Sequence, residues 1–372
     1  MLIAVVHKDT RHSWLKSNSF LFYTYRFLHL HKNVNTYTIY FIYKILCLYI
    51  SFSLMVIKKE KKGNVTIYHL DKLISDEGME KLKNTYVKPS QIKLIIDHDA
   101  DVYTSDNTLL MIYRKKKLDK VKIDDFYDAL IKFAMTETSN RGSTSGSKER
   151  NVGSNPKIKS NIFGYFDRFA PAQKVLLREA GMKKILDVRE TRFNMDYPDQ
   201  YKKSLPLIKQ IDDYYKKYIP EKYKLQRKKA NQTHFRIADT SFTTVTTNVN
   251  FQTTIHKDKG DDIEGFGNLV VIENGKYEGA ETCFPQYGVG VDLRTSDILF
   301  MDVHQWHGNL PMKKIDKDAI RLSVVCYLRY KVWEKTKGKS KDFMIRHNNT
   351  LKKLRKTKPV GETKSNNKTR KK

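Results

Sequence analysis

The chain has 372 residues and a formal net charge of +29, with 70 lysines and arginines against 41 aspartates and glutamates. This length allows a buried core in one or two domains, and the charge favours a polyanionic partner, although a basic solubilising surface gives the same balance. The three cysteines are scattered and form no C-x-x-C pair, which excludes a disulfide framework and a cysteine zinc site and favours a reducing intracellular compartment.

The first 54 residues form a hydrophobic segment. Residues 37–56 are long enough and apolar enough to cross a bilayer, with Lys44 as the one charged residue. A membrane anchor is one interpretation. We favour the other, that residues 1–54 are not part of the working protein, because a pattern typical of a soluble domain begins directly after Met55 and no signal-peptide cleavage site is evident.

Residues 55–135 predict a small accessory α+β domain. Its strand patterns cover residues 64–70, 92–98 and 108–115, and its helical patterns cover residues 75–86 and 124–135. The following segment, residues 136–158, is rich in Ser, Gly, Thr and Asn and predicts a flexible linker.

Residues 159–333 predict the main domain. Two helical patterns, at 170–181 and 204–219, come first. From residue 240 the chain changes to short strand patterns separated by Gly, Asn and Asp, which is typical of an antiparallel sandwich or jelly roll. The final forty residues carry fifteen lysines and arginines against three acids, so residues 334–372 predict a disordered basic tail.

A histidine and an aspartate two positions apart are candidates for metal ligands. His256 and Asp258 follow a run of threonines and asparagines, and alternate residues of a strand point to the same face. Two neutral imidazoles and a carboxylate form the usual site for non-haem Fe(II), so this pair supplies two of the three ligands. Alone, such a pair is more often a solvated surface pair. His304 and His307 offer the third ligand.

Arg321 and Ser323 follow on one face of a predicted strand, fourteen and sixteen residues after His307. This order suits an iron site that also binds 2-oxoglutarate, because the distal carboxylate of the oxo acid needs a fixed fork of donors, which arginine supplies. Ser323 can help to hold the same carboxylate. The alternatives are an arginine on the strand surface and a serine facing the core.

Five stretches carry a resemblance to a known family. They are GYFDR at 164–168, FTTVTTNVNFQTTIHKDKGD at 242–261, GFGNLVVIE at 265–273, DILFMDVHQWHGN at 297–309 and RLSVVCYLR at 321–329. With them, the chain resembles the TET/J-binding-protein branch of the 2-oxoglutarate/Fe(II) dioxygenases, closest to the J-binding-protein-type thymine hydroxylases. The resemblance runs from about residue 163 to 330 and leaves out residues 1–160 and the tail.

The resemblance implies a double-stranded β-helix flanked by helices, so the whole chain is expected to be α+β. It implies Fe(II), 2-oxoglutarate and O₂, with His256, Asp258 and His307 as catalytic metal ligands and Arg321 and Ser323 as cofactor-binding residues. It also implies DNA as partner, reached by base flipping, with hydroxylation of a pyrimidine 5-methyl group. Thymine is favoured over 5-methylcytosine on kinship alone, because the chain has too few cysteines for the zinc sites of TET proteins.

Several neighbouring residues have two interpretations each. Arg192 is a further cofactor contact or a helix-surface charge, and Asn248 and Asn250 read a base edge or simply end a strand. We expect Asp261 to be a turn residue and Trp306 a core residue.

Two other functions remain open, a protein side-chain hydroxylase with the same iron chemistry and a catalytically inactive DNA-binding relic. No obligate protein partner is evident, and in a eukaryotic cell a DNA substrate predicts the nucleus.

Overall fold

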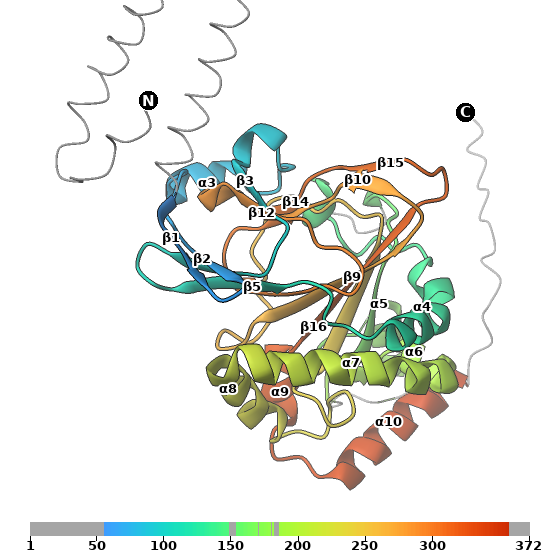
Figure 1. Cartoon of the computed structure of the whole chain (residues 1–372). Helices are drawn as coiled ribbons and strands as arrows, with labels where there is room; N and C mark the ends of the chain where they lie inside the picture. The colour runs from blue at the N-terminus through green and yellow to red at the C-terminus, as the bar shows by residue number, and fades with distance from the viewer. Residues whose placement is uncertain (1–55, 149–153, 170, 180, 182–185, 357–372) are drawn as a thin grey trace, which may run out of the picture. The chain divides into compact units, whose positions relative to one another are not determined.

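The computed structural model describes residues 56–148, 154–169, 171–179, 181 and 186–356 (Figure 1). The chain divides into two compact units, Met1–Leu54 and Met55–Lys372, and the described residues all belong to the second. The predicted hydrophobic segment 1–54 and, except for Val56, the candidate span 37–56 therefore lie outside the described residues. Within the described part, no helix combines the length and the apolar character needed to cross a bilayer.

The core of this unit is a jelly roll of two antiparallel sheets. The large sheet contains, in this order, β13 (Ile298–Met301), β9 (Gly267–Asn274), β16 (Ile320–Tyr327) and β8 (Thr244–Val249). The small sheet contains β14 (Gly308–Asn309), β11 (Thr282–Phe284) and β12 (Val289–Val291), and a backbone bridge between His256 and His307 extends it. The chain passes repeatedly between the two sheets, with the hairpin of β11 and β12 inside the small one, as in a jelly roll, which confirms the predicted fold class.

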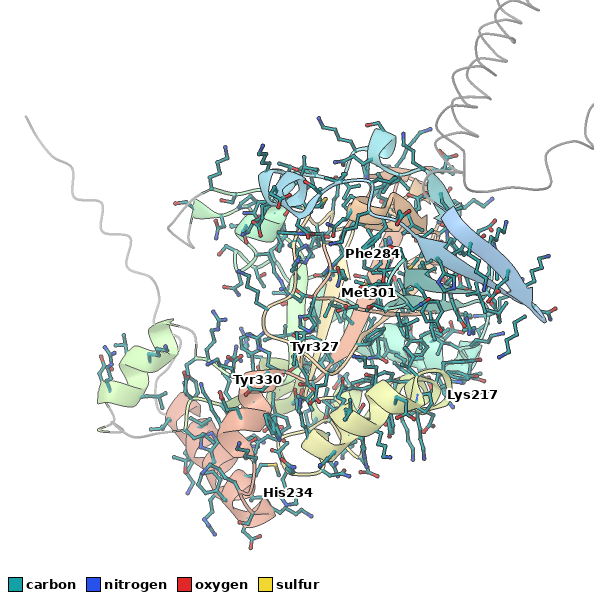
Figure 2. All side chains as sticks on the ribbon, turned by 90° about the vertical axis from the view of Figure 1, so that its left-hand side faces the viewer. Lys217, His234, Phe284, Met301, Tyr327 and Tyr330 are labelled. Carbon is teal, nitrogen blue, oxygen red and sulfur yellow. The ribbon has the colours of Figure 1, made fainter. Side chains whose placement is uncertain are left out.

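Strand register decides which side chains face the interior. In β16 the side chains of Arg321, Ser323, Val325 and Tyr327 lie on one face, because alternate residues of a strand share a face. Antiparallel pairing sets Ser323 opposite Asn248 of β8. The β-branched residues of β8 and β16 suit these half-apolar strands. Figure 2 shows the buried side chains of Phe284, Met301 and Tyr327 among the strands.

The prediction of a separate accessory domain at residues 55–135 is wrong. Its strands β5 (Leu109–Arg114), β4 (Ala100–Thr104), β2 (Val65–Leu70) and β1 (Val56–Lys62) continue the large sheet outward from β13. Its remaining strand, β3 (Leu94–Ile96), pairs in parallel with β12 of the small sheet. The alternating pattern predicted that strands exist here, but not which strands they pair with.

Helices cover the outer face of the large sheet (Figure 1). Helix α7 (Pro198–Tyr218) packs against α4 (Lys120–Ala134), and both bury their apolar faces in the main hydrophobic core. The buried residues of α7 recur at the three- and four-residue spacing of one helix face, as Leu207, Ile208, Ile211 and Tyr215. The smaller helices are α5 (Pro171–Glu179), α6 (Arg192–Asp196), α8 (Pro220–Ala230) and α3 (Asp76–Leu82), whose buried Met79 packs with Cys283 of the small sheet.

The segment predicted as a flexible linker, 136–158, is partly built into the fold. Thr138 and Ile158 pair through their backbones, and the Thr254 amide donates a hydrogen bond of 3.0 Å to the carbonyl of Thr144. Residues 149–153 lie outside the described residues. Short polar side chains can satisfy backbone groups locally as well as solvate a linker, so composition alone does not distinguish the two cases.

The prediction of disorder for residues 334–356 is also wrong. Helix α9 (Tyr330–Thr336) and helix α10 (Lys341–Lys356) occupy this segment. On α10, the buried ring of His347 lies 2.6 Å from the Val188 carbonyl, and Phe343 and Met344 pack against a second hydrophobic cluster. On the same helix, Lys341, Arg346 and Lys353 are exposed, an amphipathic pattern that net charge alone does not reveal. Residues 357–372 lie outside the described residues.

Candidate active site

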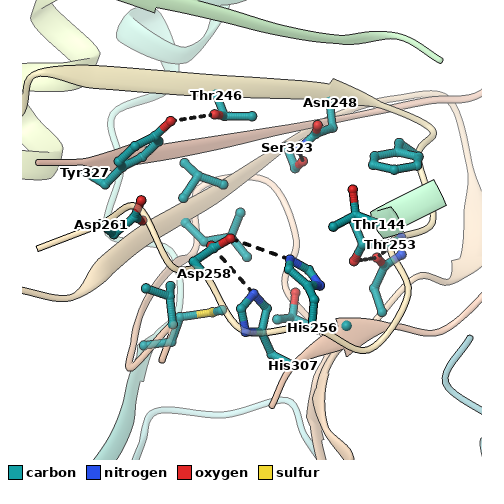
Figure 3. A pocket seen from close by; sticks show the side chains of 18 of the residues that line it. Thr144, Thr246, Asn248, Thr253, His256, Asp258, Asp261, His307, Ser323 and Tyr327 are labelled. Atoms are coloured by element: carbon teal, nitrogen blue, oxygen red, sulfur yellow. Dashed lines mark hydrogen bonds and ion pairs between the residues drawn. The ribbon is translucent and has the colours of Figure 1, made fainter. Parts of the chain in front are cut away.

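The backbone of two loops brings three predicted ligands together. The amides of His256 and His307 each donate a 2.9 Å hydrogen bond to the other residue's carbonyl, and the Asp258 amide donates one of 2.9 Å to Val303. The two imidazole ring centres are 4.4 Å apart. Figure 3 shows the Asp258 carboxylate facing both rings. The relative positions of the three side chains therefore depend on backbone hydrogen bonds, which do not require any ligand.

The distances between the side chains fit a metal site. His256 Nε2 is 3.7 Å from Asp258 Oδ1, and His307 Nε2 is 3.8 Å from Asp258 Oδ2. One potential ligand atom from each residue lies within 4.8 Å of the others. A metal ion placed among them can reach all three, and two imidazoles with one carboxylate are the donor set typical of non-haem Fe(II).

The second nitrogen of each imidazole is engaged by a backbone carbonyl. His256 Nδ1 lies 2.7 Å from the Thr254 carbonyl, and His307 Nδ1 lies 3.0 Å from the Gln305 carbonyl. A carbonyl can only accept, so Nδ1 carries the proton in both rings and Nε2 presents its lone pair toward Asp258. Burial, and then the neighbouring His256, lower the pKa of His307 to about 4, so this imidazole is neutral near pH 7.

His304 lies outside this cluster. Its Nδ1 is 2.9 Å from the Asp258 carbonyl and its Nε2 is 3.3 Å from the Asp262 carbonyl. The ring therefore connects two points of the loop that carries Asp258. The structure brings His307, the residue favoured from the sequence, to the other two candidate ligands, and His304 instead contacts the loop that carries Asp258.

A cavity of about 140 Å³ adjoins the three residues. Both sheets contribute to its wall. From the large sheet come Thr246, Asn248, Leu269, Met301, Arg321, Ser323, Val325 and Tyr327, and from the small sheet come Thr282, His307, Gly308 and Asn309. In Figure 3, Asp261 and Tyr327 lie to one side of Asp258, and Thr144 and Thr253 lie to the other.

Arg321 is a buried cation without a carboxylate partner. Its side chain lines the cavity, the residue is 6% exposed, and among the described residues no salt bridge involves it. Its Nε has no hydrogen-bond partner. Glu273 lies opposite Arg321 in the neighbouring strand. Its carboxylate instead accepts hydrogen bonds from Arg294 Nη1 at 3.2 Å and from the Thr295 amide at 2.8 Å. A buried charge costs free energy unless it is paired, so this position suits the carboxylate of a ligand.

A row of hydrogen-bonded polar side chains continues from Ser323 along the cavity wall. Asn248 Nδ2 donates to Ser323 Oγ at 3.3 Å, and Ser160 Oγ donates to Asn248 Oδ1 at 2.6 Å. Arg141 Nε then donates to Ser160 Oγ at 2.9 Å. Each member fixes its neighbour, so this wall presents donors and acceptors in set positions.

Other predicted residues do not reach the cavity. Asn250 has a left-handed backbone (φ 49°) and uses its side chain to hold the start of β16, accepting from the Arg321 amide at 2.7 Å and donating to the Ala319 carbonyl at 3.0 Å. Arg192 is exposed on α6, 3.4 Å from Asp196. Trp306 is buried in a hydrophobic cluster, which confirms its expected place in the core.

The structure adds residues that sequence reasoning missed. Asp261, expected in a turn, lines the cavity, where burial and then the charge of Asp258 raise its pKa well above its usual range. Arg141 comes from the segment predicted as a linker, which gave no signal for it. Tyr327 lies six residues after Arg321, so the period of two along β16 contained the signal for it.

Arg329 closes one side of the cavity. Its Nε donates to Asp167 Oδ1 at 2.6 Å, and its guanidinium lies 4.7 Å from the ring centre of Phe166. The side chain passes so close to Gly260 that a Cβ atom at that position would collide with it. A side chain at position 260 would therefore displace the Arg329 guanidinium next to the loop that holds Asp258.

Comparisons with known proteins agree with this geometry. Residues 179–330 match the model of the Tet_JBP family, the oxygenase domain of the 2OGFeDO superfamily. The chain is 31% identical over 202 residues to the bifunctional helicase and thymine dioxygenase JBP2 of Leishmania braziliensis, covering 54% of this chain and 16% of that protein. It is 31% identical over 173 residues to the thymine dioxygenase JBP1 of Trypanosoma brucei brucei, covering 46% and 19% respectively. The chain thus spans less than a fifth of the length of these relatives.

A solved structure of NgTET1 in complex with 5mC DNA is similar at a TM-score of 0.43 and 14% identity, covering 71% of this chain and 86% of that one. A similarity at this level does not by itself establish a shared fold. The assignment of the jelly roll depends instead on the strand order and pairing of the chain itself.

Proposed function

We propose, on the premise that residues 179–330 are an oxygenase domain of the TET/JBP family, that this chain is a 2-oxoglutarate- and Fe(II)-dependent dioxygenase that hydroxylates the 5-methyl group of a pyrimidine in DNA. The observation that carries the proposal is the convergence of His256, Asp258 and His307 within 4.8 Å beside the unpaired Arg321. Thymine is favoured over 5-methylcytosine because the similar JBP1 and JBP2 proteins are thymine dioxygenases by name.

In this proposal, His256, Asp258 and His307 hold Fe(II), and Arg321 with Ser323 holds the distal carboxylate of 2-oxoglutarate. When bound, Fe(II) with 2-oxoglutarate and O₂ supplies the oxidation of a methyl C–H bond. The protein's contribution is position and shielding. The carbonyls of Thr254 and Gln305 fix the two imidazole rings, and the apolar side chains of Leu269, Met301, Val303 and Val325 exclude water from the cavity.

The substrate has to enter this cavity as a single base. The 5-methyl group of a stacked pyrimidine lies in the major groove, out of reach of a metal held inside a jelly roll, so the base must be flipped out of the duplex. Arg141, Asp261 and Tyr327 provide donors and an acceptor in the cavity wall for the edge of such a base. The net charge of +29 supplies the attraction to the phosphates.

Mass spectrometry of nucleosides tests this function directly. Duplex oligonucleotides containing thymine only, or thymine and 5-methylcytosine, are incubated with the protein, Fe(II), ascorbate and 2-oxoglutarate, with Asp258→Ala as the control. We expect 5-hydroxymethyluracil from wild type and none from the variant. Hydroxymethylcytosine alone would reassign the base. Release of succinate that depends on added protein substrates but not on DNA would contradict the proposal and favour a protein hydroxylase.

A further inference from the structure

A tyrosine behind the cavity has a buried hydroxyl group with no hydrogen-bond partner. Tyr277 belongs to β10 (Tyr277–Gly279), which pairs with β15 (Met312–Lys314), and it is 6% exposed. Among the described residues, no group forms a hydrogen bond of regular geometry with its hydroxyl. Buried polar atoms of proteins are nearly always satisfied, so an exception requires an explanation.

The Nε atom of Arg321 is also unpartnered. The two residues are neighbours in the fold: Tyr277 packs against Ala319, two positions before Arg321. The Arg294 side chain over the Tyr277 ring pairs with Glu273, which lies opposite Arg321 in the sheet. The two side chains act on each other: burial lowers the pKa of Arg321 and Tyr277 opposes this, while burial raises the pKa of Tyr277 to about 12 and Arg321 opposes that. One atom is a donor without an acceptor, and the other is a hydroxyl oxygen that can accept. The Arg321 Nε–H group and the Tyr277 hydroxyl oxygen are therefore a suitable donor and acceptor for each other.

The position of the Tyr277 ring is well determined. The guanidinium of Arg294 lies 4.7 Å from the ring centre, and Arg294 Nη1 donates to the Tyr277 carbonyl at 3.3 Å. The ring also packs with Ala280 and Ala319 in a small cluster. Arg294 itself is committed to Glu273 and Asp292. Its charge is therefore neutralised locally, whereas Arg321, within the part of the chain that the structure describes, forms no ion pair with a carboxylate.

We propose that Tyr277 is a positioning residue for Arg321, its hydroxyl oxygen accepting from Arg321 Nε so that the two terminal nitrogens of the guanidinium face the cavity. This inference rests on the proposed function, because the group that the guanidinium nitrogens would bind is the distal carboxylate of 2-oxoglutarate. An arginine binds a carboxylate through two parallel N–H donors only when its plane is fixed. A hydrogen bond at Nε fixes that plane, and a phenylalanine at position 277 would fill the same space without it.

The test is equilibrium binding of 2-oxoglutarate to the full chain loaded with Ni(II), which takes the place of Fe(II) without turnover, measured by calorimetry. The second ligand is 2-oxopentanoate, which lacks the distal carboxylate. We expect Tyr277→Phe to weaken 2-oxoglutarate binding about 10-fold, the order expected for a hydrogen bond to a charged group, and to change 2-oxopentanoate binding less than about 2-fold. Tyr214→Phe, which removes a hydroxyl that donates to the Lys117 carbonyl away from the cavity, is the matched control and should bind both ligands as wild type does.

A second comparison uses Arg321→Lys, which has no Nε to position. In that background, Tyr277→Phe should add no further loss, whereas an equal loss in both backgrounds would overturn the inference. An unchanged affinity of Tyr277→Phe for 2-oxoglutarate would also overturn it, as would an equal weakening of both ligands, which would indicate general support of the pocket. If wild type binds no 2-oxoglutarate, the proposed function itself fails, and the two failures are thereby distinguished.

Discussion

At the scale of single residues, the sequence predicted that His256 and Asp258 converge, but not the backbone hydrogen bonds that bring them together. The spacing of His256 and Asp258 predicted their convergence through the alternation of a strand. In the structure, the backbone around His256 forms only a one-residue bridge to His307, and Asp258 is held by the carbonyl of Val303. The residues could be predicted because the ligand types and their spacing are specific. The hydrogen bonds that place them could not, because they join residues 51 positions apart, His256 and His307, and 45 positions apart, Asp258 and Val303.

The first prediction separates the two candidate histidines. We expect His307→Ala to abolish Fe(II) binding and 2-oxoglutarate turnover, because it removes one of the three proposed ligands. His304→Ala should bind Fe(II) about 10-fold more weakly and stay active, because it removes only a support of the Asp258 loop. Anaerobic Fe(II) titration and succinate release measure both effects. An inactive His304→Ala with an active His307→Ala would reverse the ligand assignment.

The second prediction concerns Arg321. Leaving a buried carboxylate without its partner costs about 2–5 kcal/mol, so Arg321→Ala should raise the apparent KM for 2-oxoglutarate at least about 30-fold. Arg321→Lys should also be damaging, because lysine keeps the charge but loses the fork. Fe(II) affinity should stay near wild type in both variants. Arg192→Ala is the matched control, since that arginine is exposed on α6, and an unchanged KM for Arg321→Ala would show that Arg321 is not the clamp.

At the scale of elements, the sequence predicted the individual strands better than their partners. The pattern at residues 108–115 predicted β5 almost to the residue, yet it was interpreted as part of a separate domain. Strand pairing between β5 and β13 joins residues some 190 positions apart, and an alternating pattern carries no information on such pairing. The same holds for residues 136–148, whose polar composition concealed their contacts with the Asp258 loop.

The third prediction tests whether β5 and the jelly roll unfold together. The buried hydroxyl of Tyr113 on β5 donates to Asp297 Oδ2 at 2.6 Å. Tyr113→Phe removes this bond to a carboxylate and should lower the free energy of unfolding by about 1.5–3 kcal/mol, within one cooperative urea transition. Tyr103→Phe, on β4 and outside the interface with the jelly roll, should change it by less than about 0.5 kcal/mol. Two separate transitions, with only one shifted, would restore the accessory-domain interpretation.

At the scale of the whole molecule, the main feature is the large positive net charge. The net charge of +29 is spread over helices such as α8, where Lys222, Lys224, Arg227, Lys228 and Lys229 follow one another within eight residues, and over the chain end. This distribution was evident from the sequence because charge needs no folding to be counted. The order of the strands in the two sheets and the cavity between the sheets could be predicted only in general terms, from the family resemblance.

The fourth prediction concerns the last sixteen residues. Residues 357–372 contain six lysines and arginines and one glutamate. Each phosphate contact contributes about 0.9 to the slope of log affinity against log salt for duplex DNA, so removing these residues should reduce the slope by up to about 5. Hydroxylation of a short oligonucleotide at low salt should persist, because the cavity is intact. A slope equal to that of the full chain would exclude this segment as a phosphate-binding element.

The pairing of β3 with β12 has a consequence for the timing of folding during synthesis. Leu94 pairs with Val289, so a ribosome must add 195 more residues before β3 meets its partner, which takes about 10 to 40 s at ordinary rates of translation. During that interval, the edges of β3 and β5 are unpaired and can bind other chains. The nascent strands β3 and β5 therefore need chaperones or dilution for longer than a domain that folds on itself, because the jelly roll is completed only after β16 has been synthesised.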